Sequence, residues 1–127
     1  MENMVSIWFG NFETEKALEE YTERSYTRDG DGISSAFCKE FFAGKKPFEL
    51  DLFERYRVED DSDDIRVLLE GCSYDMSVIP ALAAEIGEKL DKTYNAVLLT
   101  FDFAADSALA QIKGQVDYIA IVPYQKV

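Results

Sequence analysis

The chain has 127 residues, of which 47% are hydrophobic and 30% are charged, and its formal net charge is −12. This composition is typical of a folded protein with one core, and we expect residues 1–127 to form a single domain. The negative charge argues against binding to nucleic acid or to an anionic membrane surface, because both attract Lys and Arg. A basic protein is the natural electrostatic complement.

Several common signals for location and chemistry are missing from the sequence. The N-terminal residues lack the basic and apolar regions of a signal peptide, and no apolar run is long enough to span a membrane, so we expect a cytoplasmic protein. The absence of histidine removes the usual general base and the commonest zinc ligand. Cys38 and Cys72 lie in apolar contexts, which favours buried free thiols over a disulfide.

The first third of the chain predicts a strand and two helices. Residues 4–9 are rich in β-forming side chains and end at Gly10, and Thr14 can cap a helix that continues to about Thr22. The segment 27–32, TRDGDG, is typical of turns. An apolar residue then recurs every fourth position and predicts a second helix that stops near Gly44: Ile33, Phe37, Phe41.

The middle of the chain predicts a strand and two more helices. Apolar and charged residues mostly alternate over 49–58, although Phe53 and Glu54 break the pattern. Ser62 is a good N-cap for a short helix that stops at Gly71. A longer helix is expected over 77–90 with Pro80 in its first turn. Its buried stripe would comprise Ile79, Leu82, Ala83, Ile86 and Leu90.

The last third contains two nearly continuous apolar runs, 94–103 and 116–122, which predict strands covered on both faces. The segment between them fits either a short helix or a long connection. Taken together, the elements predict an α+β fold in which one mostly antiparallel sheet of about four strands carries helices. Long apolar strands also leave open a weak dimer formed edge to edge, so we expect a monomer or a weak homodimer.

Five carboxylates crowd the stretch VEDDSDDI at residues 58–65: Glu59, Asp60, Asp61, Asp63 and Asp64. With Ser62 as N-cap, Asp63 and Asp64 would occupy the first helical turn, where the helix dipole favours negative charge. The other three exceed what the fold requires. The spacing lacks the alternating ligands and closing Glu of a calcium loop, and we expect no metal and no cofactor.

Two further features are candidates for a binding face. Asp29 and Asp31 lie in the glycine-rich turn, and if the turn folds near the acid run the two would make one strongly negative surface. Phe53 or Tyr56 is a possible aromatic anchor beside it. Asp102, inside an apolar strand, is either a paired polar contact or a residue at the strand end that faces solvent. We find no nucleophile elbow, P-loop, dinucleotide fingerprint or metal-ligand cluster, so we expect no enzyme.

Several stretches of the sequence indicate more about function than the composition does. The opening VSIWFGNFET (5–14) resembles the start of the immunity protein 22 family of bacterial polymorphic toxin systems. The similarity continues through DGDGISSAFCKEF (29–41), LLEGCSYDMSVI (68–79), YNAVLLTFDF (94–103) and VDYIAIVPY (116–124). It is weakest between residues 44 and 64.

This resemblance implies a non-catalytic protein that binds and neutralises a toxin encoded beside it. Shared residues in such a family are more often fold-makers than toxin contacts, so the resemblance implies structural roles for Trp8, Gly10, Asn11, Phe12, Gly71 and Asp102. We therefore expect toxin contact at the acidic loops, with a basic toxin domain such as a nuclease. The alternative is an acidic adaptor or nucleic-acid mimic that binds a basic housekeeping partner.

Overall fold

The computed structural model describes residues 3–30, 32–45 and 47–126. Its α-helices and β-strands are, in chain order, β1 (Met4–Gly10), α1 (Glu15–Thr22), β2 (Ser25–Tyr26), β3 (Gly32–Ile33), α2 (Ala36–Phe42), β4 (Phe53–Asp64), α3 (Ile65–Leu69), α4 (Asp75–Ile86), β5 (Lys89–Phe101) and β6 (Val116–Pro123). Two short 3₁₀ helices, η1 (Leu50–Leu52) and η2 (Ser107–Gln111), precede β4 and β6. The α+β prediction is confirmed.

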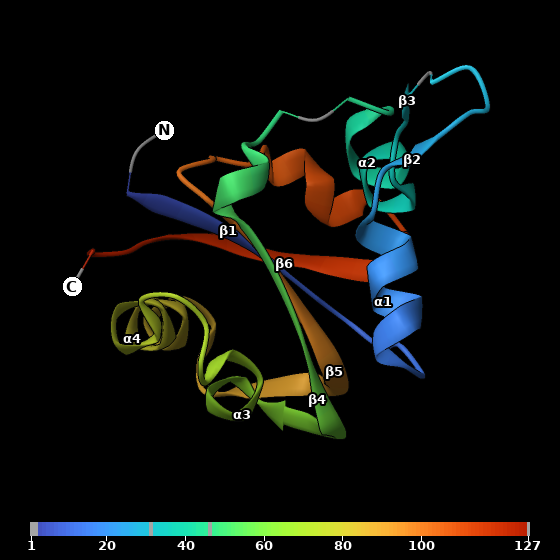
Figure 1. The fold of residues 1–127 in the computed structure, drawn as a ribbon. Coiled ribbons are helices and arrows are strands. Elements are labelled where there is room, and N and C mark those ends of the chain that lie inside the picture. The colour runs from blue at the N-terminus through green and yellow to red at the C-terminus, as the bar shows by residue number, and fades with distance from the viewer. Residues whose placement is uncertain (1–2, 31, 46, 127) are drawn as a thin grey trace.

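The main sheet has four strands in the order β4-β5-β1-β6, and every neighbouring pair is antiparallel. Helices lie on both faces of this sheet: α1 and α2 on one side, α3 and α4 on the other (Figure 1). β1 is central, and its residues from Val5 to Gly10 are all buried. This explains why β5 reads as continuous apolar sequence, since it is covered on both faces. The other apolar run, β6, was expected to be covered in the same way, but it is an edge strand and several of its residues are only partly buried.

The two faces of β1 enter two different cores. Val5, Ile7 and Phe9 pack with α3 and α4, whereas Trp8 packs on the other face with the aromatic side chains of α2. Trp8 is completely buried, as expected, and its ring meets Phe37 edge to face at 5.0 Å and 90°. Alternation of side chains along a strand therefore divides one short segment between two hydrophobic layers.

Helix starts follow the side chains that cap them. Thr14 accepts the amide hydrogen bond of Ala17 at 3.0 Å, which fixes the start of α1 as predicted. The second helix begins later than the apolar spacing suggested. Ile33 belongs to β3, and α2 starts at Ala36 because the hydroxyl of Ser35 accepts the amide of Cys38. The two cysteines are buried and unpaired.

The strand expected over 49–58 is displaced along the chain. Residues 50–52 form η1, closed by a 3.0 Å hydrogen bond from the Leu52 amide to the Glu49 carbonyl. β4 begins at Phe53 and runs through the whole acid run to Asp64. Consequently Leu50 precedes the strand and is 58% exposed.

The fourth helix also differs from its prediction. α4 spans Asp75–Ile86, so Pro80 lies within the helix and Leu90 belongs to β5. Val78 and Leu82 are its buried residues, while Ile86 is 36% exposed. The ambiguous segment before β6 contains η2, which Asp106 caps by accepting the amide of Ala108 at 2.9 Å.

Candidate functional site

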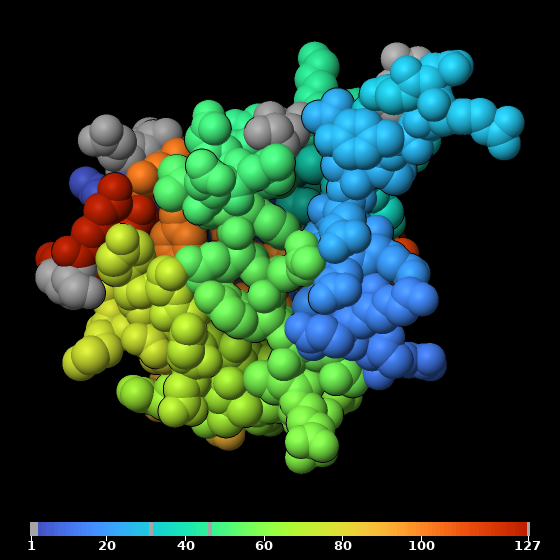
Figure 2. Space-filling view, viewed as in Figure 1, coloured from blue at the N-terminus to red at the C-terminus, as the bar shows by residue number. Residues whose placement is uncertain are grey.

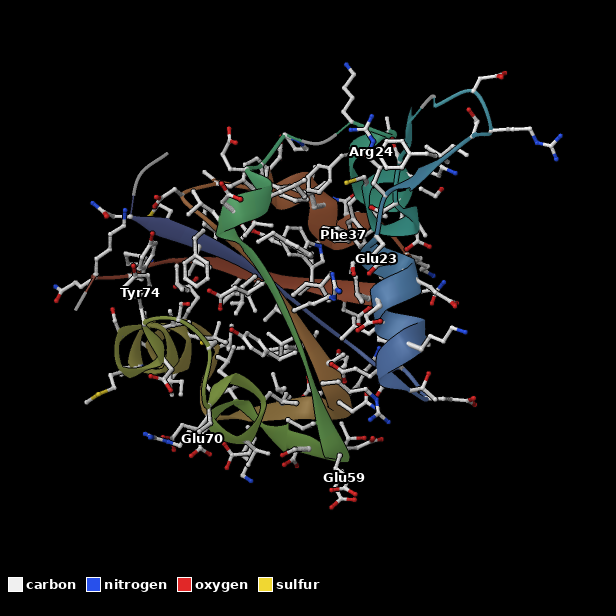
Figure 3. The ribbon with its side chains drawn as sticks, in the orientation of Figure 1. Glu23, Arg24, Phe37, Glu59, Glu70 and Tyr74 are labelled. Carbon is white, nitrogen blue, oxygen red and sulfur yellow. The ribbon has the colours of Figure 1, made fainter. Side chains whose placement is uncertain are left out.

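The acid run lies at the far end of β4, the outermost strand of the sheet. Glu59, Asp60 and Asp61 are exposed, and none of them forms an ion pair within the described part of the chain. Figure 3 shows the Glu59 side chain projecting from the lower end of the molecule, away from the helices. The run is therefore a projecting corner of the sheet and not a loop before a helix.

The strand bends at this corner. β4 pairs with β5 in one regular register from Phe53 to Arg57, and the register shifts between Arg57 and Ser62 and again before Asp64. Figure 1 shows β4 turning at its lower end toward α3. An irregular ladder of this kind bends a strand and re-aims its side chains, which carries residues 59–61 outward.

Asp63 and Asp64 have local roles different from those predicted. The Ser62 hydroxyl accepts the amide of Asp64 at 3.0 Å, but Ser62 is not the N-cap, because pairing with β5 keeps the chain extended to Asp64. Asp64 itself caps α3, its carboxylate accepting the Arg66 amide at 2.9 Å. The expectation that both carboxylates lie in the first helical turn is therefore wrong.

Lys89 neutralises these two carboxylates in part. Its Nζ lies 3.3 Å from Asp63 and 3.7 Å from Asp64. The hydrogen bond to Asp63, followed by the charges of both carboxylates, raises the pKa of Lys89. The lysine stays charged at physiological pH, so the uncompensated negative charge of the run is concentrated on residues 59–61.

The two aromatic candidates pack against the body of the protein. Phe53 stacks on Phe37 and Phe48, with ring centroids at 5.9 and 5.3 Å. The hydroxyl of Tyr56 donates to Glu54 at 2.6 Å on the opposite face of the sheet. Burial, reinforced by that hydrogen bond, raises the pKa of Tyr56. In this arrangement neither ring projects from the surface as an anchor would.

The glycine-rich turn lies away from the acid run. It joins β2 to β3 beside α2, at the opposite end of the molecule from Glu59 (Figures 1 and 3). Asp29 is exposed there, and Asp31 lies outside the described residues. Asp29 therefore does not share one surface with the carboxylates of β4.

Residues 10–12 of the opening motif fix the turn that leaves β1. Phe12 exchanges two hydrogen bonds with the buried side chain of Asn95: its amide donates to Oδ1, and its carbonyl accepts from Nδ2, both at 2.8 Å. Asn11 donates more weakly to the Thr93 carbonyl, at 3.2 Å. A Cβ atom at Gly10 would lie 2.5 Å from Val116 Cγ1, so only glycine fits there without displacement.

Asp102 directly follows β5 and has a left-handed backbone, φ 56°. Its carboxylate accepts the Asn3 amide at 2.8 Å, the Tyr124 hydroxyl at 2.5 Å and the Lys126 ammonium at 3.2 Å. The bond from Tyr124 is the main reason that the pKa of Asp102 falls below its ordinary value. Asp102 is thus a paired polar contact that joins the end of β5 to both chain ends. Gly71, another expected scaffold residue, has φ +92° and donates its amide to Asp75 at 2.9 Å.

The structure also shows surface features that the sequence analysis missed. Several large apolar side chains are exposed, among them Tyr26 (67%) and Met76 (87%). A hollow of about 220 Å³ opens beside Leu50, between the end of α1, α2 and the start of β4. Its apolar walls include Phe48 and Phe53.

The described residues contain no group of three or more His, Cys, Asp or Glu side chains arranged to hold a metal ion. No helix of the described chain is long and apolar enough to cross a membrane. The structure is that of a small acidic α+β protein with three exposed carboxylates at one corner of its sheet.

Comparison with known proteins places this chain in a family. The sequence profile of the family described as immunity protein 22 matches residues 5–125, and the chain belongs to that family. Membership indicates a toxin-neutralising role, carried out by binding a cognate toxin, in a family that is generally non-catalytic. No curated protein matches the chain. No solved structure matches it either.

Proposed function

We propose that this protein is a non-catalytic immunity protein that neutralises a basic toxin domain of the nuclease type through the acidic corner of β4. The observation that carries the proposal is the set of three exposed carboxylates, Glu59, Asp60 and Asp61, which have no ion-pair partner in the described chain. The net charge of −12 adds a long-range attraction for a basic partner.

A nuclease suits this surface for a simple electrostatic reason. Nucleases bind phosphates with Lys and Arg, and the same cationic surface attracts carboxylates. Carboxylates that approach such a surface speed the encounter and compete with the substrate phosphates. The protein would act inside the cell that makes the toxin, before the toxin can reach the nucleic acid of that cell.

The proposal is tested by co-expression with the protein encoded by the adjacent gene. We expect this chain to restore growth and to co-purify with that protein in a stable complex. The control is Leu98→Asp, which places a charge at a completely buried position and should abolish both effects by unfolding the protein.

The outcomes separate the two candidate functions. Growth restored together with a complex supports immunity. If neither rescue nor complex is seen while the wild-type chain is folded and expressed, the immunity proposal fails. Capture of a basic housekeeping protein in the same experiment would favour the adaptor function, because the acidic surface would attract such a partner equally well.

A further inference from the structure

The outer side of β4 is an open sheet edge. β4 pairs with β5 on one side only, and beyond Phe53, whose amide donates to the Leu50 carbonyl, no backbone hydrogen bond joins its other side to any residue the structure describes. Figure 2 shows the strand in green crossing the middle of this face, between α1 in blue and the yellow-green α3 and α4 region, with no helix over it. β4 has 12 residues, so its unpaired N–H and C=O groups form a long template for another strand.

Charge is the main feature that protects this edge from self-association. Eight of the 12 residues of β4 are charged, and six of those eight are acidic. Two copies paired in parallel would bring their acid runs together, which repels, whereas two copies paired antiparallel over 53–58 would hold the runs apart. Residues 59–64 carry five carboxylates and no cation, so a basic segment that continues past residue 58 is favoured as the occupant.

The two cations of β4 are already engaged elsewhere. Arg55 forms an ion pair with Glu23 at 3.5 Å. The guanidinium of Arg57 donates to the carbonyls of Phe12 and Glu13, at 2.9 and 2.8 Å. Both arginines lean toward α1 and the turn before it, so they tie the edge to the body of the protein. The carboxylates at residues 59–61 remain free to meet a cationic partner.

We propose that the open edge of β4 receives an extended basic segment of the toxin as an additional strand. Residues 53–58, which precede the bend, would supply the backbone hydrogen bonds. Glu59, Asp60 and Asp61 would meet Lys or Arg side chains at one end of that segment. This inference rests on the proposed immunity function and specifies how the toxin is held.

Backbone pairing predicts a specific pattern of amide hydrogen exchange. In an edge strand, alternate amides point away from the sheet and exchange readily, while the others already bond to the neighbouring strand. Exchange is measured in this chain alone and in its complex with the product of the adjacent gene. That gene product carries a substitution that inactivates the toxin. We expect exchange of the outward amides within 53–58 to slow at least tenfold in the complex.

β6 supplies an internal control, because it is the other edge of the same sheet and lies outside the proposed contact. Its exchange should not change. A complex that protects β6 or the α3–α4 region and leaves 53–58 unchanged would overturn this inference while the immunity function stands. Protection confined to 59–64 would overturn it too, because side chains alone would then make the contact.

Two further outcomes are distinguishable. Protection of 53–58 in the chain alone that grows with protein concentration would identify a second copy as the occupant and overturn the assignment to the toxin. Failure to form any complex would remove the proposed function, and this inference with it. The wild-type chain is used throughout, so a folding defect cannot imitate any of these results.

Discussion

The ammonium group of Lys89 lies 3.3 Å from the carboxylate of Asp63, across the ladder that joins β4 to β5. The same group is 3.7 Å from Asp64, whose backbone is directly opposite Lys89 in the register. One lysine therefore serves two of the five carboxylates of the acid run. The remaining three are the ones that should govern attraction to a basic toxin.

The first prediction concerns the rate of association. Replacing Asp60 and Asp61 by Asn should slow association with the toxin by roughly three- to tenfold at low salt and flatten its salt dependence. The matched control is Glu70→Gln with Glu85→Gln, which changes the net charge equally at two exposed carboxylates, one directly after α3 and one on α4. Stopped-flow kinetics at several salt concentrations measures both. Equal slowing by the two variants would show that net charge, and not this corner, attracts the toxin.

The second prediction has the opposite sign. Replacing Lys89 by Gln removes the cation that faces Asp63 and Asp64 and makes the corner more negative. Association should become faster by about twofold and more sensitive to salt. Because Lys89 is exposed, the fold should tolerate the change with little loss of stability. A slower association in this variant would place Lys89 in contact with the toxin and contradict the electrostatic interpretation.

Local sequence signals predicted those elements whose determinants are close together in the chain. Thr14 caps α1 through a residue only three positions away, and the central strands are apolar because both their faces are covered. The acid run was harder to interpret. It has the composition of a solvated loop, yet it is extended because β5 pairs with it. The extended conformation of the acid run depends on pairing with β5, which is more than 20 residues away in the sequence, and the local residue pattern does not indicate that pairing.

The candidate site shows the same limit. Exposure of Glu59, Asp60 and Asp61 followed from their charge, but their place on an open sheet edge depends on strand order. Phe53 and Tyr56 were candidates because aromatic residues often anchor interfaces, and tertiary packing instead turns both rings inward. No local signal indicates that Asn95 binds the backbone of Phe12, because the two residues are 83 positions apart in the chain.

The third prediction concerns the pH dependence of stability. Hydrogen bonds from Tyr124 and Asn3, and the ammonium of Lys126, lower the pKa of Asp102. A carboxyl whose pKa is lowered by folding stabilises the protein above its unfolded pKa of about 3.9, and that contribution is lost as pH falls through the lower folded value. Asp102→Asn should therefore cost about 1–2 kcal/mol at pH 7 and progressively less below pH 4.

Asparagine tolerates the left-handed backbone at this position, so the substitution tests charge and hydrogen bonding rather than strain. Urea unfolding of the two proteins between pH 7 and pH 2 measures the difference. Tyr124→Phe, which removes the largest cause of the shift, should reproduce part of the effect. A difference between wild type and Asp102→Asn that stays constant with pH would refute the assignment.

The fourth prediction concerns the turn after β1. Asn95→Ala would leave the buried amide of Phe12 without a partner, while the Phe12 carbonyl would keep its hydrogen bond from Arg57, and should cost about 1–3 kcal/mol in the free energy of unfolding. Asn11→Ala is the matched control, because it removes an exposed and longer hydrogen bond and should cost less than about 1 kcal/mol. Chemical denaturation compares them. Similar losses for the two variants would show that the buried pair has no special weight.

The fifth prediction tests the close contact between β1 and β6. Alanine at Gly10 would place its Cβ 2.5 Å from Val116 Cγ1, a separation that real Cβ atoms do not show. Gly10→Ala should therefore destabilise the fold by about 1–3 kcal/mol through overpacking. Val116→Ala alone should also be destabilising, because Val116 is buried and its truncation leaves a cavity. The informative quantity is the coupling between the two substitutions.

If the clash with Val116 is the cause, Gly10→Ala should cost less stability in the Val116→Ala background than in the wild type. The loss of unfolding free energy in the double variant should then be smaller than the sum of the two single losses by about 0.5–3 kcal/mol. Gly71→Ala is a useful contrast, because no atom lies within 4 Å of its added Cβ and only its positive φ is strained. Its cost should be unaffected by Val116→Ala. Additive losses for Gly10 and Val116 would mean that Gly10 is required for backbone conformation and not for the approach of β6.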